Sequence, residues 1–183
     1  MKKIFLIFII FLFSFGTFAQ DETAAELDEL FNQLKKTNNP MSARKIEGKI
    51  WKLWTTHPTQ DSLTSLLAKG SEYMAQNELT SAHNVFSKAI ELDPNWAEAW
   101  NKRATVLYLM GNYELSQKDI DMVLSLEKRH FGALSGQGLV QIALKNYEKA
   151  LDSYIEAHKI YPSMKSTLKM MEKLRVLIQQ ESI

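Results

Sequence analysis

The stretch that decides the fold is residues 63–94, LTSLLAKGSEYMAQNELTSAHNVFSKAIELDP, because its pattern returns twice further along the chain. Residues 97–128 read AEAWNKRATVLYLMGNYELSQKDIDMVLSLEK, and residues 131–162 read FGALSGQGLVQIALKNYEKALDSYIEAHKIYP. Each of these segments begins 34 residues after the one before it. Similarity at one fixed period within a chain is typical of arrays that stack a single supersecondary unit. We therefore expect three structural repeats.

The three segments share columns of small residues and of large apolar residues. Small residues on two facing helices let the backbones approach closely, and large residues fill the remaining gaps. We therefore expect each repeat to be a pair of antiparallel helices, joined by turns at Asn77, Gly111 and Lys145. The small columns are Gly70, Ala104 and Gly138, and Ala82, Ser116 and Ala150, and the large column is Phe86, Ile120 and Tyr154.

The segments on either side of the repeats also have the spacing of amphipathic helices. Apolar residues recur every three or four positions over residues 22–36 and again after Pro40, which suits the first turn of a helix. Together these segments predict an N-terminal helical hairpin within residues 20–60. Residues 163–183 are predicted to form a capping helix. Because proline is scarce and good helix formers are abundant, the predicted fold class is all-α.

The repeat columns resemble the tetratricopeptide repeat (TPR) family, whose pattern is W-x2-L-G-x2-Y, then A-x3-F-x2-A, then P. The match is clear at GSEYMAQNELTSAHNVFSKAIELDP, residues 70–94, and at NYEKALDSYIEAHKIYP, residues 146–162. Four residues depart from the pattern, and the first helix of the third repeat is therefore expected to pack more loosely. These residues are Lys69, Arg103, Lys128 and Gln141.

The resemblance implies a right-handed α-solenoid of three TPR helix pairs, over residues 61–94, 95–128 and 129–162. It also implies a non-catalytic protein-interaction module that binds a partner peptide or helix on its concave side. The segments AWNKRATVLYLMGNY and RHFGALSGQGL, residues 99–113 and 129–139, resemble exported TPR proteins of alphaproteobacteria.

The first nineteen residues have the pattern of a secretory signal peptide. Lys2 and Lys3 precede an unbroken apolar run, and Ala19 precedes a predicted cleavage point before Gln20. We therefore expect an exported, periplasmic protein of the cell envelope. An uncleaved inner-membrane anchor is the alternative, although the apolar run is shorter than the roughly 20 residues that a spanning helix prefers.

Composition narrows the classes of partner and chemistry. The formal net charge is +1, and it becomes −1 once Lys2 and Lys3 leave with the signal segment. Nucleic acid is excluded as a partner, because binding phosphates requires clustered basic charge. The chain contains no cysteine, which excludes disulfides, thiol nucleophiles and cysteine-ligated metals. We expect a protein or peptide partner and no cofactor.

The stretch EKRHFGALSGQGLV, residues 127–140, holds a histidine, a serine and three glycines, but it matches no phosphate-binding or nucleophile motif. Gly138, and with it Gly136, is predicted to serve helix packing, and His130 to cap a helix or to reach solvent. An active site would require Ser135 and His130 to converge with a carboxylate in an open pocket.

The remaining titratable residues give no sign of chemistry either. The histidines lack metal-ligand spacing, and His83 and His158 are expected near solvent. Glu114, Asp119 and Asp121 are predicted to lie on solvated helix faces. We therefore predict no catalytic residue and no metal site.

The tryptophans are expected to pack inside the molecule. Trp100 lies in a column of large residues and is predicted to be core. The other three are expected to wedge the N-terminal hairpin against the array, or to offer a partner an anchor. These are Trp51, Trp54 and Trp96.

Binding residues are expected along a stripe displaced by roughly 100° from the core columns of each first helix. Asn101 and Tyr108 are best suited to hold a peptide, since one side chain hydrogen-bonds a backbone and the other offers a rigid ring. The stripe lacks lysine and arginine clusters for a carboxyl terminus. It comprises Thr64, Leu67, Ser71, Met74, Glu98, Asn101, Thr105, Tyr108, Gly132, Ser135, Leu139 and Ile142.

Two alternatives to an open groove remain. In the first, the hairpin or the capping helix covers the stripe. In the other, the protein is a self-associating or complex-docking assembly subunit that acts through its aromatic hairpin.

Overall fold

The computed structural model describes residues 22–181, which form helices and turns and contain no strand. The first helix spans residues 22–36. It is followed by α2 (Pro40–Thr55), α3 (Asp61–Ala75), α4 (Leu79–Leu92), α5 (Ala97–Leu109), α6 (Tyr113–Leu126), α7 (Phe131–Ala143), α8 (Tyr147–Ile160) and α9 (Lys165–Glu181). The predicted signal segment lies outside the described residues. Within residues 22–181 no helix is long and apolar enough to span a membrane.

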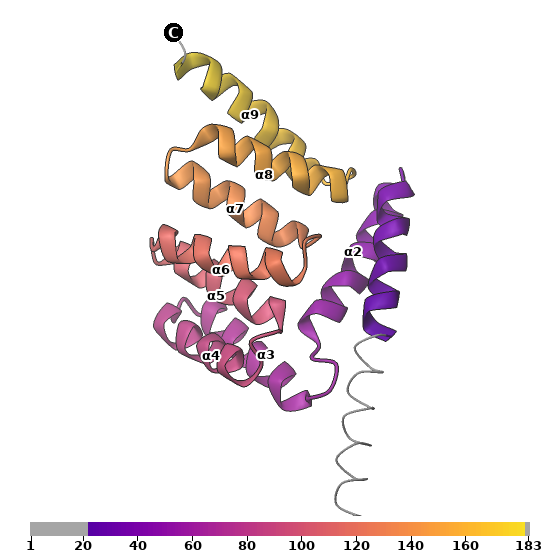
Figure 1. Ribbon diagram of the computed structural model, residues 1–183, viewed down its shortest axis with the longest axis vertical. Coiled ribbons are helices and arrows are strands. Elements are labelled where there is room, and N and C mark those ends of the chain that lie inside the picture. The colour runs from indigo at the N-terminus through magenta and orange to yellow at the C-terminus, as the bar shows by residue number, and fades with distance from the viewer. Residues whose placement is uncertain (1–21, 182–183) are drawn as a thin grey trace, which may run out of the picture.

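The three helix pairs α3–α4, α5–α6 and α7–α8 stack in chain order, and α9 packs on α8 at the end of the stack (Figure 1). This arrangement is the all-α solenoid that the 34-residue period predicts. Consecutive helices contact one another throughout because each pair buries its apolar face against the next pair.

The small residues of the first and third repeats allow close packing within a pair. A Cβ atom added at Gly70 would lie 2.5 Å from the Phe86 ring, and one added at Gly138 would lie 2.5 Å from the Tyr154 ring. The role predicted for Gly138 is therefore confirmed. In the second repeat, the Ser116 hydroxyl donates a hydrogen bond to the Ala104 carbonyl oxygen at 2.7 Å. Ser116 therefore serves as the small residue of this column, and its buried hydroxyl has a hydrogen-bond partner.

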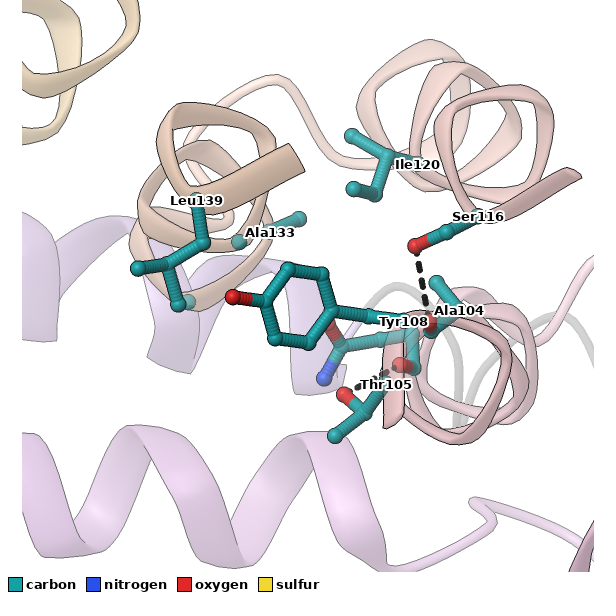
Figure 2. Close-up of a pocket in the computed structure, with 10 residues that line it drawn as sticks. Ala104, Thr105, Tyr108, Ser116, Ile120, Ala133 and Leu139 are labelled. Carbon is teal, nitrogen blue, oxygen red and sulfur yellow. Dashed lines mark hydrogen bonds between the residues drawn. The ribbon is translucent and has the colours of Figure 1, made fainter. Parts of the chain in front are cut away.

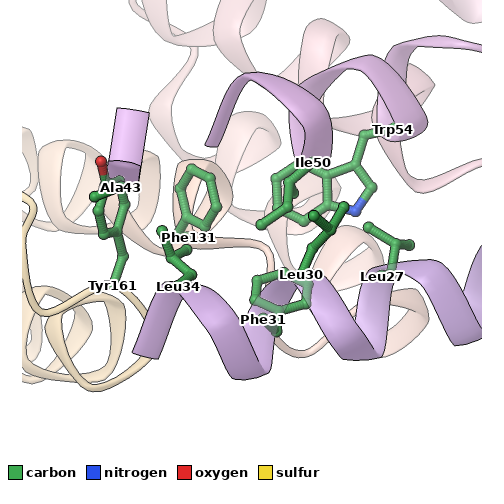
Figure 3. Packing of buried hydrophobic residues seen from close by; sticks show 9 residues of the cluster. All are labelled: Leu27, Leu30, Phe31, Leu34, Ala43, Ile50, Trp54, Phe131 and Tyr161. Carbon is green, nitrogen blue, oxygen red and sulfur yellow. The ribbon is translucent and has the colours of Figure 1, made fainter. Parts of the chain in front are cut away.

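The N-terminal hairpin lies beside the stack rather than continuing it (Figure 1). Asn39 caps α2, with its side-chain oxygen accepting hydrogen bonds from the N–H groups of Met41 and Ser42, and Pro40 occupies the first turn as predicted. The two hairpin helices share one hydrophobic core with Phe131 and Tyr161 of the array (Figure 3). The remaining buried members of this core are Leu27, Leu30, Phe31, Leu34, Ala43, Ile50 and Trp54.

Tryptophans fix the hairpin to the first two repeats. The Trp96 indole N–H donates to the Trp54 carbonyl oxygen at 2.9 Å, and both side chains are buried. This contact confirms the predicted wedge. Trp100 differs from the core residue expected, because it is half-buried and donates to the Pro94 carbonyl oxygen. Pro94 itself lies in the turn before α5 rather than in that helix, which begins at Ala97.

Candidate functional site

The predicted stripe on the first helices does not form one open groove along its length. On α3, Leu67 is only 2% exposed and belongs to the core, and Met74 packs against that core. The Thr64 hydroxyl oxygen accepts the His57 backbone N–H at 2.8 Å. Ser71 donates to a carbonyl oxygen of its own helix. These four residues therefore serve the first repeat itself.

At the start of α5, the stripe is buried beneath the hairpin. Glu98 is 1% exposed, and its carboxylate accepts hydrogen bonds from Asn101 and from the ring of His130, each at 3.0 Å. The Lys102 ammonium lies 3.3 Å from the other carboxylate oxygen. These three partners compensate the buried negative charge, which would otherwise be costly.

His130 is wholly buried and joins three parts of the molecule. Its Nδ1 atom accepts the Ala133 backbone N–H at 3.0 Å, so the ring caps α7. This confirms the first of the two roles predicted for His130. Since Nδ1 accepts, the proton lies on Nε2, which donates to Glu98. The ring also stacks on Trp54 with centroids 3.9 Å apart. The alternative prediction that His130 reaches solvent is wrong, because the hairpin covers it.

α2 covers the start of α7 as well. A Cβ atom added at Gly132 would lie 2.7 Å from the Trp51 ring, and the Lys102 ammonium lies over the same ring. The hairpin therefore occupies the first-helix face where α5 and α7 begin.

Further along these helices a pocket of about 70 Å³ remains between α5, α6 and α7 (Figure 2). Five residues of the predicted stripe line it, and they are Asn101, Thr105, Tyr108, Gly132 and Leu139. Leu139 is 40% exposed and stands opposite Tyr108 across the pocket (Figure 2). The other lining residues are Ala104, Ser116, Ile120, Ala133 and Gly136.

The polar atoms of the pocket are neutral, and several already have partners. Thr105 donates to the Asn101 carbonyl oxygen at 3.0 Å, and Ser116 donates to the Ala104 carbonyl oxygen. The Asn101 amide N–H₂ donates to Glu98, which leaves its side-chain oxygen as an acceptor. Asn101 is only 8% exposed, so it offers less surface than the prediction assumed.

Charged residues near the pocket are paired. The Arg103 guanidinium forms two hydrogen bonds to Asp119, at 2.7 and 2.8 Å, and lies over the Trp100 ring. The prediction that Asp119 lies on a solvated face is wrong, because the carboxylate is buried against this arginine. Arg103 and Asp119 thus hold α5 against α6 where the family pattern has a leucine.

Gln141, another departure from the family pattern, is also buried in a network of side-chain hydrogen bonds. Its amide donates to Gln117 at 2.7 Å, and its oxygen accepts from Asn146 at 2.9 Å. Since α7 keeps these partners, the expected looseness of its packing does not follow from Gln141.

The residues of a potential active site do not converge. Ser135 donates to the Phe131 carbonyl oxygen of its own helix, away from His130. Ile142 packs against the core that Tyr154 shares with α9, so it is not part of the pocket. His83 and His158 are half-buried rather than near solvent. In residues 22–181, no cluster of three or more histidine or acidic side chains is arranged to hold a metal ion.

A second cleft, of about 430 Å³, lies between the first helix and the end of α8. Its arginine, Arg129, donates hydrogen bonds to Glu127 and Asp28, and hydrogen bonding to Glu127 is the main cause that raises its pKa. The Arg129 guanidinium also lies over the Phe31 ring. These contacts tie the first helix to the array and leave little of the guanidinium for a ligand.

Gly136, one of the two glycines that line the pocket, is the residue that sequence reasoning misread. A Cβ atom added at Gly136 would meet only the Ile120 Cδ1 atom, at an ordinary 3.8 Å. Packing therefore does not require glycine at this position, unlike at Gly138. The sequence did contain a sign of this, because Gly136 lies within a predicted helix but belongs to neither column of small residues. Ala104 and Ser116 were seen only as packing positions, because the pocket forms from three helices at once.

Comparison with known proteins identifies the repeat. A family model described as TPR repeat matches residues 70–111. A TPR repeat-containing protein of Rhizobium etli is 36% identical over an alignment of 143 residues, and the match covers 74% of this chain and 70% of that protein. An Hsp70-Hsp90 organizing protein of Glycine max is 29% identical over 100 residues, and the match spans 18% of its length.

Solved structures share the fold. The first TPR of Spaghetti (RPAP3), bound to an HSP90 peptide, has a TM-score of 0.62 at 20% identity and covers 64% of this chain and 93% of its own. The Yersinia enterocolitica secretion chaperone SycD, in complex with a peptide of the translocator YopD, has a TM-score of 0.60 at 14% identity, with 64% and 95% covered. Repeat period, helix stacking and the Rhizobium etli relative agree, and the chain belongs to the tetratricopeptide repeat family.

Proposed function

We propose that this protein is a non-catalytic protein-interaction module that binds a segment of a partner protein in the pocket between α5 and α7. The observation that carries the proposal is the pocket itself. It is the part of the predicted stripe that combines open volume, an exposed apolar side chain and unshielded polar atoms. The TPR structures of RPAP3 and SycD, which hold peptides, add support by analogy of fold.

The rigidity of the pocket favours binding. Its walls belong to helices fixed by the Arg103–Asp119 pair on one side and by the Glu98–His130 contact on the other. A preformed site removes the cost of ordering the host, so more of the interaction energy appears as affinity.

The alternative of assembly through an aromatic hairpin surface receives less support. Trp54 and Trp96 are 6% and 7% exposed, and Trp51 packs on Gly132 and on Trp54. The aromatic surface that would dock on another copy is thus already used inside the molecule.

We further propose that the protein acts in the cell envelope, after export and removal of residues 1–19. The basic head, the apolar run and Ala19 before the cleavage point support this proposal.

The binding proposal is tested by site-specific photo-crosslinking in the native cells. A crosslinking amino acid at Thr105, which is exposed and lines the pocket, is expected to give a discrete protein adduct. The same amino acid at Leu92, which is 56% exposed on α4 and outside the pocket, is the control and is expected to give none. Leu139→Asp in the Thr105 variant should remove the adduct, because it places a charge in an apolar site. Equal adducts from both positions would contradict the proposal.

A further inference from the structure

Gly136 carries a cost that the fold does not explain. A glycine inside a helix is less stable than alanine by roughly 1 kcal/mol. Gly138 and Gly132 on the same helix are required, since a Cβ atom there would collide with Tyr154 or Trp51. Gly136 has room for a Cβ atom, and that room is the pocket. The missing side chain therefore serves to keep the pocket open.

The size of the pocket limits what enters it. Its volume is about 70 Å³. This is roughly half the volume of the engineered protein cavity that binds benzene. Small residues, Ala104, Ala133 and Gly136, are among those that line the pocket. One aliphatic side chain of the size of valine or leucine fits such a space better than the larger benzyl group of phenylalanine.

The residues that line the pocket are all uncharged, and the charged residues of α5 are paired, so the pocket favours an uncharged ligand group. α7 contains no charged residue. On α5, Lys102 is paired with Glu98, and Arg103 is paired with Asp119. No unpaired cation on these two helices remains to compensate a carboxylate that leaves water, and no unpaired anion remains for an ammonium. The ligand group that complements this surface is uncharged.

The rim of the pocket offers groups that suit a peptide backbone. The Tyr108 hydroxyl reaches toward Leu139 at the rim (Figure 2), and no hydrogen bond to it occurs among the described residues. Asn101 also lines the pocket, and its side-chain oxygen is an acceptor because its amide N–H₂ donates to Glu98. One donor and one acceptor beside an apolar hole match the N–H and C=O groups that flank a side chain in an extended segment.

We propose that the pocket binds one branched aliphatic side chain, leucine, isoleucine or valine, from an uncharged segment of the partner, and that Gly136 sets this specificity. The inference rests on the proposed function for its biological meaning. It adds the chemistry of the ligand, which differs from the acidic peptide SRMEEVD bound by the RPAP3 neighbour.

Blocked amino acids test the chemistry directly. The ¹⁵N-labelled protein, residues 20–183, is titrated with N-acetyl-leucine amide, N-acetyl-aspartate amide or N-acetyl-phenylalanine amide, and amide shifts are followed by NMR. The leucine compound is expected to shift the amides of Gly136, Leu139 and Tyr108 in a saturable way. The other two are expected to bind at least tenfold more weakly. Equal binding of the aspartate compound would overturn the inference.

Two glycine variants separate the pocket from stability. Gly136→Ala fills the pocket, whereas Gly48→Ala on α2 adds a methyl group with no atom within 4 Å and outside the pocket. Both should raise the unfolding midpoint by roughly 2 to 4 °C, through helix propensity. Only Gly136→Ala should weaken leucine binding, by at least tenfold. Full binding by a folded Gly136→Ala variant would refute the role of this glycine.

The outcome also separates this inference from the proposed function. A crosslinked partner whose contacting segment is charged would overturn the aliphatic pocket and leave the interaction role intact. Leucine binding to the pocket, with no adduct from Thr105 in cells, would keep the pocket chemistry and remove the proposed function.

Discussion

At the residue scale, one turn recurs three times with different side chains. Asn77, Gly111 and Lys145 have φ values of 60°, 77° and 60°, and each follows the first helix of a repeat. The next residue in each turn donates its N–H back to the helix, from Glu78 to Tyr73 in the first repeat, at 2.8 Å. This geometry is the left-handed helix end that glycine adopts without strain and asparagine tolerates. Lysine at this position is strained.

Lys145→Gly is therefore expected to stabilise the protein. Relieving the left-handed conformation of an L-residue gains roughly 1 kcal/mol, from which the greater entropy of glycine in the unfolded chain subtracts a part. We expect the free energy of unfolding in urea to rise by about 0.5 kcal/mol. Gly111→Ala is the converse variant, and it should lower the same quantity by about 1 kcal/mol. A loss of stability in Lys145→Gly would show that the lysine side chain makes a compensating contact.

Residue patterns were read correctly for the contacts between a small and a large residue inside one repeat. Phe86 and Gly70, or Tyr154 and Gly138, are 16 residues apart and belong to one repeat, so their contact follows from the period alone. The pairs Arg103–Asp119 and Glu98–His130 were missed. The second of these joins two repeats, and nothing in the type of either residue reveals that the hairpin will cover both.

At the element scale, the hairpin and the end of the array are joined by a tyrosine. The Tyr161 hydroxyl donates to the Glu47 carboxylate at 3.0 Å, and its ring packs on Phe131. Burial, followed by this hydrogen bond, raises the pKa of Tyr161 from 10.0 to about 12. Burial, followed by the charge of Tyr108, also raises the pKa of Tyr154 to about 12.

These two pKa shifts predict a loss of stability in alkali. Below pH 10 both phenols are protonated in the folded and the unfolded chain. Between about pH 10 and 12 the unfolded chain loses these protons while the folded protein keeps them, so the free energy of unfolding falls as pH rises. We expect up to about 3 kcal/mol for each tyrosine, since one pKa unit corresponds to roughly 1.4 kcal/mol. Urea unfolding of Tyr161→Phe and Tyr154→Phe should each remove part of this slope, and an unchanged slope in both variants would disprove the assignment.

The elements themselves follow from local signals, but their contacts with the hairpin do not. Pro40 at the first turn of α2 and the repeat columns predict where helices begin and face. The direction in which the hairpin folds back depends on the fit of Phe131 and Tyr161 into its core. That fit is a property of several helices together. The sequence alone therefore could not decide whether the hairpin covers part of the binding stripe.

At the scale of the whole molecule, a short array gains a large core by folding its own N-terminal hairpin onto one side (Figure 1). The chain has no cysteine, so packing and ion pairs must hold the ends. The first-helix face serves two purposes as a result. Near the start of α5 and α7 it binds the hairpin, and further along it keeps the pocket that we propose as the partner site.

For the whole chain, we predict a mature form that begins at Gln20. If the signal segment is removed on export, intact-mass spectrometry of the purified native protein should give a chain beginning at Gln20, recovered from the periplasmic fraction. Ala19→Pro should block processing and leave the longer, membrane-associated chain, because proline distorts the extended backbone that a cleavage site needs. A native protein that retains Met1 and sediments with membranes would instead favour the anchored form.

The sequence by itself determined the all-α class, the repeat period and the small and large positions inside each helix pair, because these depend on contacts between residues at fixed, short separations. Only the tertiary structure decided which part of the first-helix face is buried by the hairpin and which part stays open as a pocket. The reason is physical: a pocket is the space left when three or more helices meet, and Gly136 differs from Gly138 only through what lies opposite it.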